Sequence, residues 1–223
     1  MSNPARTHAR RDEEIAFLIV ERVLGVDISL ADAGAGNSAV DGAWIYVNGR
    51  RAVIEVTSPP DAEHMRDAAR AQHAGELFVE SGVVRLGPRK LSARLGELLR
   101  QEWAFENMRK LAAQDADERH LFLFGRSHRT AYPFYLLSDQ YVDAPAEPVS
   151  DLALPEGASD VWFLGRAFHA PESLDFHANV ARFNRDTGWS RHSVELEERL
   201  LPVPPGFVGE DVIDAATRRV KAR

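Results

Sequence analysis

Residues 40–57 read VDGAWIYVNGRRAVIEVT, two apolar runs that meet at Asn48-Gly49. An Asn-Gly step between runs rich in β-branched and aromatic residues is the strongest short signal for a β-hairpin. Asp41 lies at the start of the first run, and Glu55 interrupts the apolar part of the second. A carboxylate in such surroundings needs a cation, a metal ion or a proton. The pair therefore predicts a divalent-metal site, and with it phosphodiester chemistry.

The geometry of the turn decides whether these two acids can meet. A two-residue turn at Asn48-Gly49 places Asp41 and Glu55 on opposite faces of the hairpin. A three-residue loop over 47–49, with Gly49 in the left-handed region, shifts the pairing by one residue. Asp41 then lies directly across from Glu55, with Cβ atoms about 5 Å apart. The metal hypothesis requires this second arrangement.

The rest of the chain has the pattern of an α/β protein. Apolar residues recur with a helical period over 12–24 and stop at Gly25. The predicted order of elements gives a central mixed β-sheet flanked by helices on both faces. We expect helices over 12–24, 61–75 and 91–113, and strands over 26–30, 120–125, 132–137 and 161–168. We also expect hairpins over 40–57 and 180–194, and a strand or hairpin over 77–86.

The 223 residues predict a single domain. Its core is expected over 12–137, a proline-rich loop or linker over 138–160, and a C-terminal elaboration over 161–223. The chain has no cysteine, no apolar run long enough for a membrane span and no apolar segment typical of a signal peptide. A cytoplasmic protein without a membrane partner is the expectation.

The acids lie in an order that resembles the PD-(D/E)XK nuclease superfamily, which includes restriction enzymes and Holliday-junction resolvases. Glu14 stands in the first helix, Val40-Asp41 stands where the family has Pro-Asp, and Ile54 to Thr57 is similar to its Glu-x-Lys strand. The resemblance covers roughly residues 12–60 and implies a restriction-endonuclease-like core. It also implies that Asp41 and Glu55 hold Mg²⁺ or Mn²⁺, and that Glu14 adds a carboxylate or orients water.

The resemblance departs from the family at Thr57, which occupies the position of the motif lysine. A threonine cannot stabilise negative charge developing on a phosphate. Four residues are candidates to take over this role: Arg51, Lys90, Arg66 and Arg70. The resemblance thus implies a catalytic set made of Glu14, Asp41, Glu55 and the position of Thr57.

Two functions remain open from the sequence. One is a metal-dependent nuclease that hydrolyses DNA or RNA, with DNA favoured. The other is an inactive nuclease-fold protein that binds nucleic acid or a protein partner. Without a metal, Glu55 is either an edge-strand residue or one salt-bridged to Arg51 or to an arginine of the next helix. The net charge of −7 does not favour nucleic acid, although residues 85–110 carry a local excess of basic groups. A homodimer is also left open.

Overall fold

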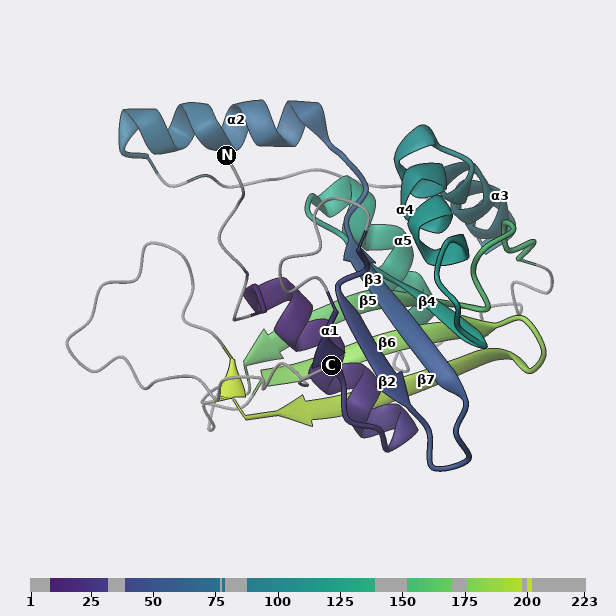
Figure 1. The fold of residues 1–223 in the computed structure, drawn as a ribbon. Helices are drawn as coiled ribbons and strands as arrows, with labels where there is room; N and C mark the ends of the chain where they lie inside the picture. The colour runs from purple at the N-terminus through teal and green to yellow at the C-terminus, as the bar shows by residue number, and fades with distance from the viewer. Residues whose placement is uncertain are drawn as a thin grey trace, which may run out of the picture.

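The computed structural model describes residues 9–31, 39–76, 78, 88–138, 152–169, 176–197 and 200–201. Apart from residue 78, the strand or hairpin expected over 77–86 lies outside these residues, as does most of the linker expected over 138–160. Five helices and seven strands are described (Figure 1). The helices are α1 (Arg11–Leu24), α2 (Ala62–Ala74), α3 (Pro88–Leu99), α4 (Glu102–Ala112) and α5 (His128–Ser138). The strands are β1 (Ser29–Leu30), β2 (Gly42–Ile45), β3 (Arg51–Thr57), β4 (Glu118–Phe124), β5 (Asp160–His169), β6 (Phe176–Asn184) and β7 (Gly188–Leu196).

The strands form one mixed sheet in the order β1-β2-β3-β4-β5-β6-β7. The pairs β3–β4 and β4–β5 are parallel, and the other four pairs are antiparallel. A parallel pair needs a crossover connection, and helices supply both. The stretch expected as a C-terminal elaboration contributes β5, β6 and β7, which continue the same sheet.

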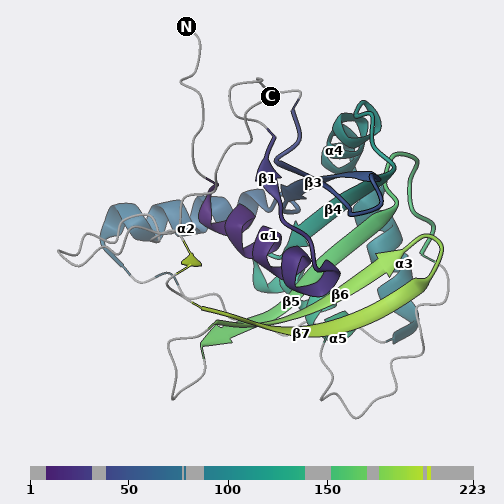
Figure 2. The same cartoon turned by 60° about the horizontal axis from the view of Figure 1, so that its bottom comes forward.

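Helices cover both faces of this sheet, as the sequence predicted. Helix α1 packs on one face, where Phe17 and Ile19 join a buried cluster with Ile54 and Trp162. Helices α3, α4 and α5 lie over the other face and contribute to a second cluster (Figures 1 and 2). Successive side chains of a strand point to opposite faces, so the parity of a residue assigns it to one cluster or the other.

Two sequence predictions are wrong. The run over 132–137, expected as a strand, lies within α5, because periodicity alone cannot distinguish a short apolar strand from a buried helix. Ser127 and Thr130 cap this helix reciprocally, each side-chain oxygen accepting from the other's backbone N–H. The single helix expected over 91–113 is two helices, because Gln101 takes an extended conformation (φ −76°, ψ 154°) and starts α4.

No helix in the described part of the chain has both the length and the apolar composition that crossing a lipid bilayer demands. Helix α2 stands apart from the others in Figure 1, and none of its residues is buried.

Two glycine-to-alanine substitutions, at Gly125 and at Gly96, test the close packing of α5 against the end of β4. A Cβ on Gly125 would lie 2.2 Å from Cα of Ala131, so the backbone must move. We expect Gly125→Ala to lower the free energy of unfolding by about 2–3 kcal/mol. Gly96→Ala is the matched control: its Cβ meets only the mobile end of Arg100, and the change should stabilise α3 by about 0.5–1 kcal/mol. Urea denaturation measures both, and equal effects would contradict this account.

Candidate functional site

The β2–β3 hairpin has the three-residue turn that the metal hypothesis requires. The backbone N–H of Tyr46 donates to Arg50 O (2.9 Å), that of Gly49 donates to Tyr46 O (2.8 Å), and Gly49 has φ +85°. The loop therefore has three residues, and Gly42 pairs with Ile54. One step further along this register, Asp41 faces Glu55.

The protein backbone holds Asp41 in place beside β3. Its Oδ2 accepts a hydrogen bond from the backbone N–H of Val56 (2.7 Å), and its carbonyl oxygen accepts from Ala31 (3.1 Å). Glu55 is buried, with 3% of its surface exposed. Glu55 belongs to the sheet face that α3, α4 and α5 cover, since it alternates with Ile54 and Val56 of the α1 side.

A lysine from a distant helix completes this group. Lys110 of α4 extends its Nζ to within 2.6 Å of Glu55 Oε1, and its side chain keeps 35% of its surface exposed. The ammonium group supplies the cation that buried Glu55 requires. No pattern in the sequence identified Lys110, which is 55 residues from Glu55. The only signal was its rarity, since the chain has three lysines.

The other predicted site residues are placed differently. Thr57 ends β3 on the same face as Glu55, paired with Leu123. Glu14 is buried in α1, which covers the opposite face. Three acids or histidines that share one ion must bring their ligand atoms together, and Glu14, Asp41 and Glu55 are not such a group among the described residues.

None of the proposed lysine substitutes has a described contact with Glu55. Arg51 pairs with Asp115 (2.8 Å) at the start of β3, and Arg70 pairs with Asp67 (3.2 Å) within α2. Arg66 donates to the carbonyl oxygen of Ala62 (3.1 Å). The side chain of Lys90 lies outside the described part. Among the described residues, the basic side chain that contacts Glu55 at 2.6 Å is instead Lys110.

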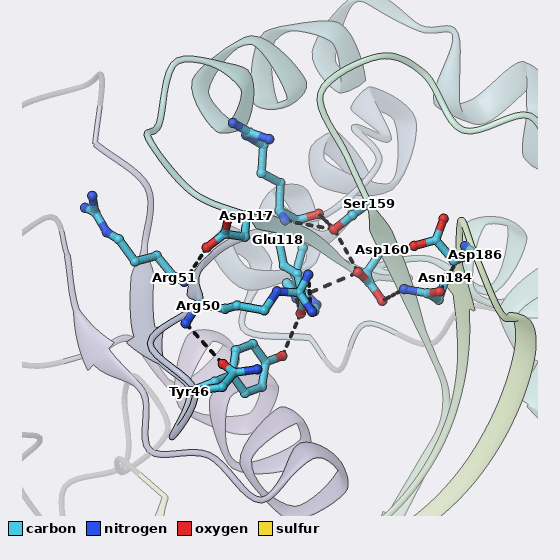
Figure 3. Close-up of polar contacts among 12 residues, drawn as sticks. Tyr46, Arg50, Arg51, Asp117, Glu118, Ser159, Asp160, Asn184 and Asp186 are labelled. Atoms are coloured by element: carbon cyan, nitrogen blue, oxygen red, sulfur yellow. Dashed lines mark hydrogen bonds and ion pairs between the residues drawn. The ribbon is translucent and has the colours of Figure 1, made fainter.

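A second polar cluster lies on the α1 face, at the start of β4 and β5. Glu118, His120 and Asp160 have ligand atoms within 4.8 Å of one another, so this group can hold a metal ion. His120 and Asp160 are fully buried. Figure 3 shows Glu118 and Asp160 side by side, with Tyr46 reaching Glu118 from the β2 side.

Protein donors already satisfy both carboxylates of this cluster. Glu118 accepts from the hydroxyl of Tyr46 (2.6 Å) and from Nε2 of His120 (3.2 Å), and Arg50 lies 3.1 Å away. Asp160 Oδ1 accepts from Nε and Nη2 of Arg182 (2.7 and 2.6 Å) and from Asn184 (3.0 Å), and its Oδ2 accepts from Ser159 (2.8 Å). Any ion bound here has to displace these donors.

The tautomer of His120 follows from its indole neighbour. Trp162 Nε1 is 3.1 Å from His120 Nδ1, and an indole N–H only donates. Nδ1 must therefore accept, and the proton of the neutral ring is on Nε2, directed at Glu118. A histidine binds a metal ion through a nitrogen lone pair, and the His120 nitrogen that faces Glu118, Nε2, carries the proton instead. The cluster is organised as a closed hydrogen-bond network, so an ion bound here competes with the donors that already hold these side chains.

The network changes the acidity of two of its members. The hydrogen bond from His120 is the main cause that lowers the pKa of Glu118 to about 2, the Tyr46 hydroxyl adds to it, and burial opposes both. Burial, followed by the hydrogen bond to Glu118, raises the pKa of Tyr46. Glu118 therefore stays ionised, and Tyr46 stays protonated, across the neutral range.

Acid should weaken the fold through Glu118. Because its pKa falls from 4.5 to about 2 on folding, its contribution is complete above pH 4.5 and is lost as the pH falls towards 2. We expect a loss of about 1–2 kcal/mol over this window, after allowance for solvent screening. Urea denaturation between these pH values measures it. Glu118→Gln should be less stable than the wild type at neutral pH and lose less on acidification; parallel curves would contradict the assignment.

Comparison with known proteins adds no relative: no protein-family model, no curated protein and no solved structure matches this chain.

Proposed function

We propose that this protein is a metal-dependent phosphodiesterase acting on nucleic acid, with Asp41 and Glu55 as the ligands of Mg²⁺ or Mn²⁺ and with a nuclease-like core of the PD-(D/E)XK kind. One observation supports this most directly: the hairpin register pairs Gly42 with Ile54, the residues next to the two acids in the sequence, and Lys110 lies 2.6 Å from Glu55. Two carboxylates and one lysine are the residue types that such a reaction uses.

The donor set fits the ion. Mg²⁺ and Mn²⁺ prefer carboxylate oxygens, and one or two protein carboxylates are a usual number for Mg²⁺ beside phosphate. Cross-strand Cβ atoms about 5 Å apart allow both carboxylates to contact one ion. The hydrogen bond from Val56 to Asp41 holds one ligand in place before an ion binds. When bound, the ion would polarise the phosphate and make an attacking water more acidic.

Lys110 takes the place that Thr57 cannot fill. Its ammonium group supplies a positive charge beside Glu55, where it stabilises negative charge developing on a phosphate oxygen. The partial exposure of its side chain leaves it accessible from solvent, whereas Glu55 is buried. This proposal gives Glu14 no role.

Cleavage of supercoiled plasmid DNA and of a labelled RNA tests the proposal. With Mn²⁺ or Mg²⁺ the wild type should nick or cut at least one substrate, and EDTA should stop it. Asp41→Asn and Glu55→Gln should each reduce the rate by about 100-fold or more. Glu156→Gln, a change at an exposed loop residue, is the matched control and should leave the rate unchanged. Cleavage that survives both site variants would rule out the assigned ligands.

A second candidate function is a nuclease-fold protein that binds nucleic acid without cutting it. The Lys110–Glu55 ion pair favours it, because the buried carboxylate already has a cation. This reading predicts no cleavage in any metal, together with DNA binding that weakens steeply as salt rises. Filter binding at several salt concentrations, run beside the cleavage assay, distinguishes the two functions.

A further inference from the structure

The edge strand β7 is unusually open to pairing. It is last in the strand order and, within the described part of the chain, pairs with β6 alone. Its nine residues are in continuous register with β6, from Gly188 opposite Asn184 to Leu196 opposite Phe176. Proteins commonly protect such an edge with proline, lysine, a bulge or a very short strand. β7 has no proline or lysine, and its register shows no shift.

The two faces of β7 differ in exposure. Val194 and Leu196 are buried in the cluster beneath α1. Three alternate residues on the other face, Arg191, Ser193 and Glu195, are exposed. Arg191 donates through Nε to Leu137 O, which holds one edge of its guanidinium group near the end of α5 and leaves the two Nη groups for another partner. Glu195 lies 4.0 Å from His177 of β6 and keeps 61% of its side chain exposed.

A hollow of about 800 Å³ runs beside this strand. Arg22 and Val23 of α1 form part of its lining, and residues 191–195 with Glu197 form the rest. Five consecutive residues of β7 therefore border open space, where an added strand has room to lie. Figure 2 shows β7 as the outermost strand of the sheet, with α1 on the side that carries Val194 and Leu196.

We propose that the occupant of this edge is a second copy of the chain, paired antiparallel through β7 about a two-fold axis at Ser193. A two-fold axis makes the interface self-complementary, so each contact occurs twice. With Ser193 on the axis, Arg191 lies opposite Glu195 of the second copy, and Glu195 lies opposite its Arg191. Directly opposed charges of opposite sign stabilise a strand pair.

Charge selects this register over its neighbours. An axis at Arg191 sets two arginines against each other, and an axis at Glu195 does the same with two glutamates; both arrangements destabilise a strand pair. An axis at His192 opposes Arg191 with Ser193, and Glu195 with Trp189, which gives no ion pair. Among these centres, Ser193 alone pairs every exposed charge of the strand. The result is one continuous sheet that spans two chains.

Sedimentation velocity over a concentration series up to about 100 µM tests the proposal. The wild type should be a dimer in rapid exchange with monomer. Arg191→Glu and Glu195→Arg each create two like-charge oppositions and should weaken dimerisation by about 10-fold or more. The double variant R191E/E195R exchanges the charges and should restore the dimer. Circular dichroism and thermal melting establish that each variant is folded.

Three results would overturn the proposal: a monomer at every concentration, a dimer that tolerates both single reversals, or a double variant as weak as the singles. Ser193→Pro provides a second measurement, since a proline on the axis removes an edge N–H and introduces a ring. It should abolish the dimer while leaving a folded monomer. These readouts are molecular masses, so they are independent of whether the protein cleaves nucleic acid.

Discussion

Replacing Arg182 by methionine should destabilise the fold by about 3–5 kcal/mol, the effect expected when a buried carboxylate loses its cation. Two nitrogens of Arg182 contact Asp160 Oδ1, and the Asp160 side chain has no solvent-exposed surface. The guanidinium carbon also lies 5.0 Å from the centroid of the Trp162 ring, so the change removes a cation–π contact as well. Urea denaturation at neutral pH measures the loss.

Two further variants separate the charge effect from simple loss of packing. In the double variant D160N/R182M neither group is charged, so its loss should be smaller than the sum of the two single losses. Arg51→Met is the matched control, because Arg51 and Asp115 form an exposed ion pair with 58% and 98% of their side chains exposed. It should cost less than about 1 kcal/mol. Equal losses for Arg182→Met and Arg51→Met would show that burial of Asp160 does not matter.

The sequence predicted those parts of the fold that depend on residues near one another in the chain. The helix ending at Gly25, the Asn48-Gly49 hairpin and the hairpin over 180–194 were predicted because each depends on neighbours in the chain. The error over 132–137 occurred where a short apolar run fits either element. Only the parallel pairing of β4 with β5, a long-range fact, makes a crossover helix necessary there.

The candidate site also has a part that the local sequence predicts and a part that depends on the fold. The register that opposes Asp41 to Glu55 follows from a local loop, so the sequence could reduce it to two alternatives. The partner of Glu55 comes from α4, and no local pattern identifies which cation the fold brings there. The network around Asp160 left a partial trace, since Glu118, His120 and Asp160 are polar residues within strand-like apolar runs. Their convergence, however, depends on the strand order.

Lys110→Met should reduce cleavage by about 100- to 1,000-fold if the lysine stabilises charge in the reaction. The same change removes an ammonium group from Glu55 Oε1, so it should not weaken the binding of Mn²⁺. The thermal stability of the variant should depend more on Mn²⁺ than that of the wild type. Lys110→Arg keeps the positive charge and should retain part of the activity. Plasmid cleavage and isothermal titration with Mn²⁺ measure the two effects.

Thermal melting with and without Mn²⁺ then separates a metal site from a structural ion pair. An ion that binds only the folded state raises the melting temperature. Without Mn²⁺, Lys110→Met removes an ammonium group from buried Glu55 and should melt below the wild type. Mn²⁺ should raise the melting temperature of Lys110→Met by more than it raises that of the wild type, because the ion takes the position of the missing positive charge. The double variant E55Q/K110M has no such charge to neutralise and should show no response. If Mn²⁺ does not stabilise Lys110→Met, the two carboxylates do not bind the ion. The Lys110–Glu55 contact would then be purely structural.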